Sequence, residues 1–238
     1  MEFIPAKCPD CGGELMLPKS KDEAICTYCG SKFFIKDAMN KTPTPSIKSW
    51  MILAKTAEET RNYAESCKYY TKVIEVDPEN VEAWLGKAES VGWQSTIADY
   101  RLGEMVLGFG HVMGLVTEPE EKVKIAKIIS EKITKVAYAY FGLTYGYVNK
   151  YIDEQGVPNN FHVTSINLAN LFDFAFELDP TNFDAISSKV EMCKSILFGG
   201  QSISRLLSKF SNSGARLEWQ NKLNESSKLL NKADSQRT

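Results

Sequence analysis

Four of the six cysteines in this chain form two Cys-x-x-Cys pairs, a spacing at which thiolates bind metal ions. Cys8 pairs with Cys11, Cys26 pairs with Cys29, and 14 residues separate the two pairs. Each pair closes a tight knuckle, and the stretch between them is long enough for one hairpin. The two knuckles can therefore present four sulfur atoms as a tetrahedron around a single ion.

The residues around the pairs fit such knuckles. Gly12 and Gly30 each follow the second cysteine of a pair, where the backbone bends amide groups toward sulfur, often at positive φ. Short strands are expected around a turn at 18–22, and they cover residues 14–17, 23–25 and 33–35. The sequence thus predicts a small β domain.

The pattern Cys-Pro-x-Cys-Gly-Gly, then Cys-x-Tyr-Cys-Gly with an aromatic pair after it, resembles the zinc-ribbon family over residues 6–36. This resemblance implies one Zn²⁺ bound by Cys8, Cys11, Cys26 and Cys29. Four thiolates leave no open position for water, so such an ion is structural rather than catalytic. Disulfides and a rubredoxin-like iron site are the alternatives. An intracellular location disfavours the first, and the lack of a redox-partner or cofactor motif disfavours the second.

The charge of this region bears on what it contacts. Its five lysines are matched by five acidic residues: Lys7, Lys19, Lys21, Lys32 and Lys36 against Glu2, Asp10, Glu14, Asp22 and Glu23. Zinc ribbons that bind nucleic acid usually carry a basic, aromatic face. A neutral surface favours a structural or protein-docking role over nucleic-acid contact.

The composition of the 238 residues is that of an ordinary globular protein, with 43% hydrophobic and 24% charged residues and a net charge of -2. This balance gives no general attraction to nucleic acid or anionic membranes. The longest apolar run, 105–116, falls short of the roughly 18 residues that span a bilayer. No secretory signal is recognisable at the start, so the expectation is a cytoplasmic protein without a membrane segment.

Residues 37–46 read as a linker because they contain two prolines and no periodicity. Beyond them the apolar residues recur at helical spacing, and no alternating strand pattern follows residue 36. The remaining prolines lie beside capping residues, with Asn80, Thr117 and Asn182 expected to cap helices. The predicted organisation is a β domain at 1–36, a linker at 37–46 and an all-α domain at 47–238.

The helical part contains traces of a 34-residue period. Trp50 and Trp84 are 34 residues apart, and the junction Asp-Pro-Glu-Asn at 77–80 returns as Asp-Pro-Thr-Asn at 179–182, an offset of three periods. A 34-residue helix–turn–helix unit is typical of the tetratricopeptide (TPR) family. The first unit resembles that family at these positions: Trp50, Leu53, Ala54, Ala57, Ser66, Tyr70 and Pro78.

The resemblance weakens along the chain. A second unit begins near Trp84, but we expect its second helix to be interrupted by glycines, which are Gly103, Gly108, Gly110 and Gly114. Residues 118–154 are predicted to form one long helix instead of a hairpin. The fold class is therefore mainly α, a small β zinc ribbon followed by a divergent, TPR-like helical solenoid.

Partner contacts are expected on the first helices of the hairpins, 47–60 and 81–91, and on a tyrosine-rich face further along. The candidate residues for binding another protein or peptide are Lys55, Lys87, Tyr140, Tyr147 and Tyr151. A second aromatic face, with Tyr138, Phe141 and Tyr145, is expected in the core. The glycine-rich stretch predicts close helix packing, with contact to a second copy of the chain left open.

No catalytic constellation is recognisable, so the chain is predicted not to be an enzyme. His111 and His162 have no metal-ligand spacing around them, and Cys67 and Cys193 are expected to be buried small hydrophobes. The leading hypothesis is an adaptor for protein–protein interaction. The alternative is a nucleic-acid-associated factor that uses the ribbon and the basic residues of 201–238, which are Arg205, Lys209, Arg216, Lys222, Lys228, Lys232 and Arg237.

Overall fold

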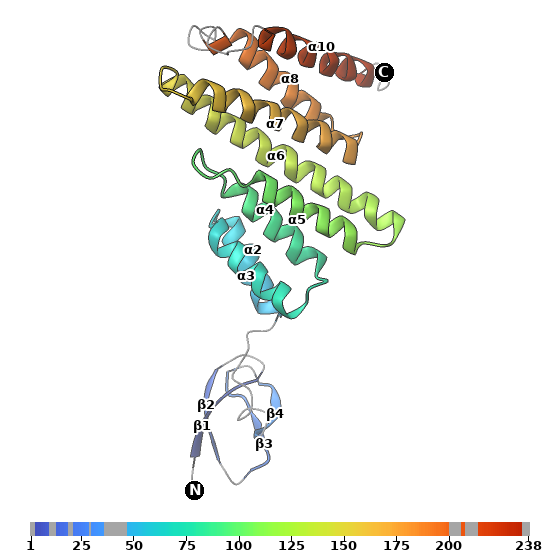
Figure 1. Cartoon of the computed structure of the whole chain (residues 1–238). Coiled ribbons are helices and arrows are strands. Elements are labelled where there is room, and N and C mark those ends of the chain that lie inside the picture. The colour runs from blue at the N-terminus through green and yellow to red at the C-terminus, as the bar shows by residue number, and fades with distance from the viewer. Residues whose placement is uncertain are drawn as a thin grey trace. The chain divides into compact units, whose positions relative to one another are not determined.

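The computed structural model describes residues 3–9, 13–18, 21–28, 30–35, 47–199, 206–207 and 214–234. The chain divides into two compact units, Met1–Leu53 and Ala54–Thr238, which are described separately (Figure 1). The expected linker at 37–46 lies outside the described residues. The predicted boundaries at residues 36 and 46 therefore stay a prediction.

The first unit contains two antiparallel sheets of two strands each. Strand β1 (Phe3–Lys7) pairs with β2 (Glu14–Pro18), and β3 (Glu23–Ile25) pairs with β4 (Lys32–Phe34). The strands expected on either side of the 18–22 turn do form, but they pair across the cysteine knuckles rather than with one another. Strand β1 was not predicted, since Pro5 lacks the amide that a strand position normally donates.

The two hairpins share one small core. Alternation along β2 points Leu15 and Leu17 inward, whereas Met16 between them is 63% exposed. The buried set consists of Cys8, Leu15, Leu17, Cys26, Phe33 and Ile35. So few apolar side chains bury little surface, and a domain of this size usually needs a further crosslink.

All described elements after residue 46 are helices, which confirms the predicted fold class in its coarse form: a mainly helical chain with small antiparallel sheets. They are α2 (Ile47–Glu59), α3 (Tyr63–Val76), α4 (Val81–Trp93), α5 (Leu102–Leu115), α6 (Pro119–Tyr151), α7 (Val157–Leu178), α8 (Phe183–Phe198) and α10 (Ala215–Asp234). Among the described residues, no helix is both long and apolar enough to cross a membrane.

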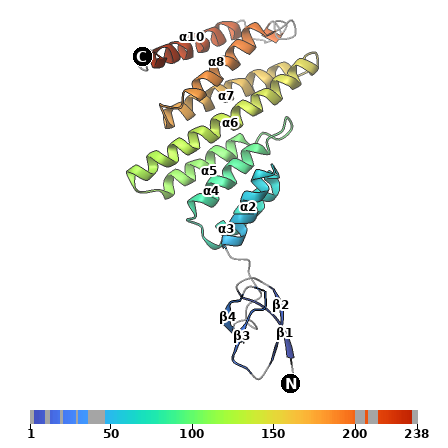
Figure 2. The same ribbon diagram turned by 180° about the vertical axis from the view of Figure 1, so that it is seen from behind.

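Within the second unit, each helix packs against its neighbours in chain order from α3 to α10. Figures 1 and 2 show this stacking from opposite sides. Helix α6 also contacts α4, α5 and α8, so it extends along much of the array. The predicted long helix at 118–154 is thereby confirmed, since α6 runs without a break for 33 residues.

The helix ends agree with the sequence in part. Asn80 caps α4 as predicted, because its side-chain oxygen accepts a hydrogen bond from Ala83 N at 2.9 Å. Thr117 does not cap α6, which begins one residue later with Glu118 at the cap position and Pro119 in the first turn. Proline has no backbone N–H, so the first turn of α6 has one amide fewer that a capping side chain such as that of threonine would have to satisfy.

Asn182 occupies the N-cap position of α8, as expected, but its side chain makes no capping hydrogen bond. Its side-chain amide instead donates to Ser130 Oγ at 2.7 Å and to Thr134 Oγ1 at 3.2 Å, both in α6. Ser130 Oγ in turn donates to the carbonyl of Ala175 in α7 at 2.6 Å. The second Asp-Pro-x-Asn junction therefore joins three helices, a role that the first junction does not have.

Helix α5 runs continuously through its four glycines, so the predicted interruption is wrong. Buried side chains on one face, such as Met105 and Phe109, hold the helix against its neighbours and outweigh the low helix propensity of glycine. Close packing is confirmed at Gly108, where an added Cβ would lie 2.8 Å from Ala88 Cβ. Three other glycines have no atom within 4 Å of an added Cβ: Gly103, Gly110 and Gly114.

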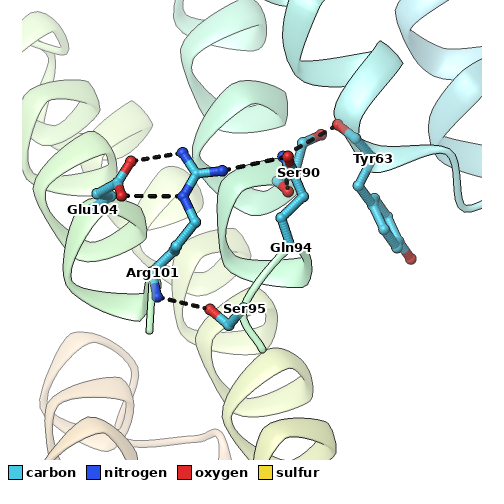
Figure 3. Close-up of polar contacts among 6 residues, drawn as sticks. All are labelled: Tyr63, Ser90, Gln94, Ser95, Arg101 and Glu104. Carbon is cyan, nitrogen blue, oxygen red and sulfur yellow. Dashed lines mark hydrogen bonds and ion pairs between the residues drawn. The ribbon is translucent and has the colours of Figure 1, made fainter. Parts of the chain in front are cut away.

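A polar network fixes the connection between α4 and α5 (Figure 3). Gln94 Nε2 donates to the carbonyls of Ser90 at 2.9 Å and of Tyr63 at 3.4 Å. Arg101 donates to Gln94 Oε1 at 3.3 Å and to the two carboxylate oxygens of Glu104 at 3.1 and 2.8 Å. This hydrogen bonding with Arg101 lowers the pKa of Glu104, so the carboxylate stays ionised and is paired with the guanidinium group.

Candidate functional site

The loops that carry the two cysteine pairs are closed by equivalent backbone hydrogen bonds. The amide of Cys8 donates to the carbonyl of Gly13, the amide of Cys26 donates to the carbonyl of Ser31, and both hydrogen bonds measure 2.9 Å. Each bond spans five residues and closes the loop between paired strands, so the second hairpin repeats the first after 18 residues. Each hairpin thus presents its first cysteine at the same point of its loop.

The second knuckle shows the backbone geometry that thiolate binding requires. Tyr28 N donates to Cys26 Sγ at 3.4 Å, and Gly30 N donates to the Cys26 carbonyl at 2.9 Å. Gly30 has a φ of 75°, which a residue with a Cβ adopts only under strain. Amide donors directed at sulfur stabilise the charged thiolate, the form that binds metals.

The two knuckles lie against each other. A Cβ at Gly13 in the first loop would come within 2.6 Å of Tyr28 Cδ2 in the second, so the aromatic ring occupies the space that glycine leaves. Cys8 and Cys26 are both buried in the core that the hairpins share. The first cysteine of each predicted pair is therefore placed in one small region.

The second cysteine of each pair, Cys11 or Cys29, lies outside the described residues, as does Gly12. Within the described part of the chain no group of three or more His, Cys, Asp or Glu side chains is arranged to bind a metal ion. The four-cysteine ligand set and the Zn²⁺ stay a prediction.

Two of the candidate partner-binding residues are lysines with different surroundings. Lys55 Nζ lies 2.5 Å from Glu82 Oε1, so its charge is already paired, and the hydrogen bond with Glu82 raises its pKa. Lys87 Nζ lies 5.3 Å from the centroid of the Trp84 ring, a cation–π contact. Of the two, Lys87 has its charge available to a partner.

The candidate tyrosines on α6 differ in their exposure. Tyr140 is buried, with its hydroxyl donating to the carbonyl of Thr96 at 3.0 Å, and burial raises its pKa. Tyr147 and Tyr151 are half-buried and lie with ring centroids 4.7 Å apart. Tyr140 and Tyr147 nevertheless line one small cavity of about 120 Å³, whose lining does not include Tyr151. A partner-binding role of the three tyrosines stays a prediction. Phe141 is in the core as expected, whereas Tyr138 is 40% exposed.

A cavity of about 980 Å³ lies along α6 and α8, and we call it the α6–α8 groove. Its walls are polar: Lys127, Glu131, Thr134, Lys135 and Tyr138 of α6 face Asp184, Ser187, Ser188 and Glu191 of α8. Tyr138 donates to Glu191 Oε2 across it at 2.9 Å. Sequence reasoning missed this groove, although Lys127, Glu131, Lys135 and Tyr138 follow helical spacing along one face.

A second groove of about 370 Å³, the α4–α5 groove, is more apolar. It is lined by Trp84, Lys87, Ala88 and Val91 of α4 and by Glu104, Leu107, Gly108 and His111 of α5. The ring of His111 lies 4.3 Å from that of Trp84. Lys87 is the member of this set that the sequence had marked for partner binding.

The other reactive side chains are in structural positions. His162 Nδ1 accepts a hydrogen bond from Trp219 Nε1 at 3.4 Å, and burial lowers the His162 pKa. Cys193 is fully buried, as predicted, and burial raises its pKa to about 11, which keeps the thiol unreactive. Cys67 is only half-buried.

The basic C-terminal stretch is described in part. Arg205, Lys209 and Arg237 lie outside the described residues. On α10, Lys222 Nζ lies 3.9 Å from Glu218, so part of the positive charge is offset locally. The nucleic-acid alternative stays a prediction.

No family model matches this chain, and no curated protein does. Among solved structures, a chain described as MamA MSR-1 C2 aligns with a TM-score of 0.30 and 11% sequence identity, covering 79% of this chain and 98% of that one. A similarity of this size does not carry an argument about fold or function. The structural class of the protein is therefore defined by its own structure. It is a mainly helical array with a small β unit that carries paired cysteines.

Proposed function

We propose that this protein is a non-enzymatic scaffold that binds another protein, with a structural zinc ribbon attached to a TPR-like helical array. The α6–α8 groove is the observation that carries the binding role. Stacked helical hairpins form extended surfaces between neighbouring helices, and such surfaces accommodate peptide segments.

The zinc part of the proposal rests on the repeated knuckle. Cys8, Cys11, Cys26 and Cys29 would hold the ion, and the fit is supported by the equal loop frames, by the Tyr28 amide directed at Cys26 Sγ, and by the contact of Tyr28 with Gly13. When bound, Zn²⁺ crosslinks the two hairpins and supplies folding free energy without taking part in a reaction. The surrounding core is too small to supply that free energy alone.

The binding part rests on the charges of the α6–α8 groove. Lys127 and Lys135 share it with Glu131, Asp184 and Glu191, so both signs of charge line one cavity. Phosphate backbones are bound by uniformly positive surfaces, whereas a peptide presents donors, acceptors and charges of both signs. The lining thus favours a protein partner over nucleic acid.

A site-specific photo-crosslinker tests this function. Placed at Ser187 in the groove of the full chain, it should capture a defined protein in the native host; placed at Glu177, which is exposed on α7 outside the groove, it should not. Unlabelled wild-type chain should compete with the captured product. Capture of RNA or DNA at Ser187, lost as salt is raised, would instead support the nucleic-acid alternative.

A further inference from the structure

The α4–α5 groove combines an exposed apolar wall with an aromatic ring. Leu107 of α5 is 77% exposed, although it belongs to a helix whose other large apolar side chains are at least partly buried. It lines the groove with Trp84, Ala88 and Val91 of α4. Exposed leucine beside a half-buried tryptophan is typical of a surface that a partner covers, since tryptophan is enriched among residues that dominate binding energy.

The charges of this groove do not balance. Glu104 contributes the carboxylate of this groove, which accepts hydrogen bonds from Nε and Nη2 of Arg101 and is therefore already paired with a positive charge. Lys87 has no carboxylate within ion-pair distance among the described residues, and it lies over Trp84. The His111 ring also packs against Trp84, with their ring centroids 4.3 Å apart. The charge left for a partner is positive.

We propose that the α4–α5 groove binds an acidic amphipathic segment of a partner protein, with an apolar side chain against Trp84 and Leu107 and a carboxylate at Lys87. The inference rests on the proposed scaffold function and adds to it the chemistry of the partner. It also places this contact on a different pair of helices from the α6–α8 groove.

The shape of the groove agrees with such an occupant. Gly108 lets α5 approach α4 closely at Ala88, and both residues line the groove. Gly103 and Gly110 lie on either side of Leu107 along α5, and no atom lies within 4 Å of a Cβ added at either glycine. A partner backbone can therefore come close to α5 on either side of the leucine.

An array of short synthetic peptides tests the proposal, with the number of Leu or Phe residues and the net charge varied independently. Binding to the full chain, measured by fluorescence anisotropy, should require both apolar residues and negative charge. Lys87→Glu should weaken the best acidic peptides by about tenfold or more and should create binding of the matched basic peptides, because the groove then carries the opposite charge. Lys72→Glu is the control, since Lys72 also lies over an aromatic ring, Tyr69, but outside the groove.

A second variant separates the groove from a general charge effect. Leu107→Ser removes an exposed side chain, so the fold should be unchanged by circular dichroism while all acidic peptides bind about tenfold more weakly or worse. The proposal is wrong if basic peptides bind wild type as well as acidic ones do, if no peptide binds, or if Leu107→Ser acts only by dissociating a dimer of this chain. Capture at Ser187 with no effect of Lys87→Glu or Leu107→Ser would overturn this inference alone and leave the scaffold function standing.

Discussion

The ring of Tyr70 in α3 lies directly against Gly86 in α4. A Cβ added at Gly86 would come within 2.2 Å of Tyr70 Cζ, and the Tyr70 hydroxyl donates to Glu58 Oε2 at 2.8 Å. Burial, together with the Glu58 carboxylate, raises the pKa of Tyr70, so the phenol remains a donor. The absence of a side chain at residue 86 thus determines how closely α3 and α4 pack.

Gly86→Ala should therefore destabilise the helical unit. The new methyl group must displace the Tyr70 ring, and overpacking of this kind costs about 1 to 3 kcal/mol, measured as the free energy of unfolding in urea by far-UV circular dichroism. Gly110→Ala is the matched control, because no atom lies within 4 Å of its added Cβ. That change should raise stability by up to about 1 kcal/mol through helix propensity. Equal effects of the two substitutions would contradict the packing argument.

The same region shows how far sequence reasoning reaches. Tyr70, Pro78 and the Asn80 cap were predicted because each acts within one helical hairpin, where spacing along the chain determines contact. The role of Asn182 was missed because Ser130 and Thr134 are about 50 residues away in sequence and meet it only in the folded array.

The β unit gives a similar lesson. The cysteine spacing predicted two knuckles, and in both loops the amide of the first cysteine donates to the carbonyl five residues later. The strand pairing was predicted wrongly, as one hairpin around the 18–22 turn, because strands of three to five residues contain too little alternation to define a partner, and Pro5 obscured β1. The α4–α5 groove had no sequence signal beyond Lys87, since a groove depends on how two helices pack.

The purified protein should contain one tightly bound zinc per chain, measured by elemental analysis. Cys26→Ser should lose the metal and unfold residues 6–36, because the ion supplies most of the folding free energy of so small a domain. Cys67→Ser, outside the β unit, should retain the metal. Protein without metal, or with iron and a visible charge-transfer band, would refute the zinc assignment.

The pH dependence of stability should carry a contribution from His162. Burial lowers its pKa in the folded state, with the charge of Glu218 acting in the opposite direction, so the unfolded chain binds this proton more readily. The contribution is present above the ordinary histidine pKa of about 6.5 and is lost as the pH falls through that value to the lower folded pKa. Urea titrations of wild type and His162→Gln, whose side-chain oxygen can still accept from Trp219, should show a smaller loss in the variant. An identical pH profile for both proteins would assign the dependence to other groups.

The ion pair between α7 and α8 provides a last test. Lys189 is buried, and its Nζ lies 2.6 and 2.7 Å from the carboxylate oxygens of Asp173. Asp173→Ala leaves the ammonium group without this partner and should cost about 2 kcal/mol of unfolding free energy, less than for a fully buried pair because the Asp173 side chain is 41% exposed to water. Lys189→Met removes the charge and keeps the apolar stem, so it should cost less than about 1 kcal/mol.

The comparison for that pair is Glu131, whose carboxylate lies 4.0 Å from the exposed Lys135. Glu131→Ala should change stability by no more than about 0.5 kcal/mol, because water and salt screen a surface pair. Chemical denaturation of the three variants ranks the effects directly. The loss of unfolding free energy should be largest for Asp173→Ala, smaller for Lys189→Met and smallest for Glu131→Ala. A larger loss for Lys189→Met than for Asp173→Ala would mean that the attraction between the charges outweighs the cost of burying the ammonium group.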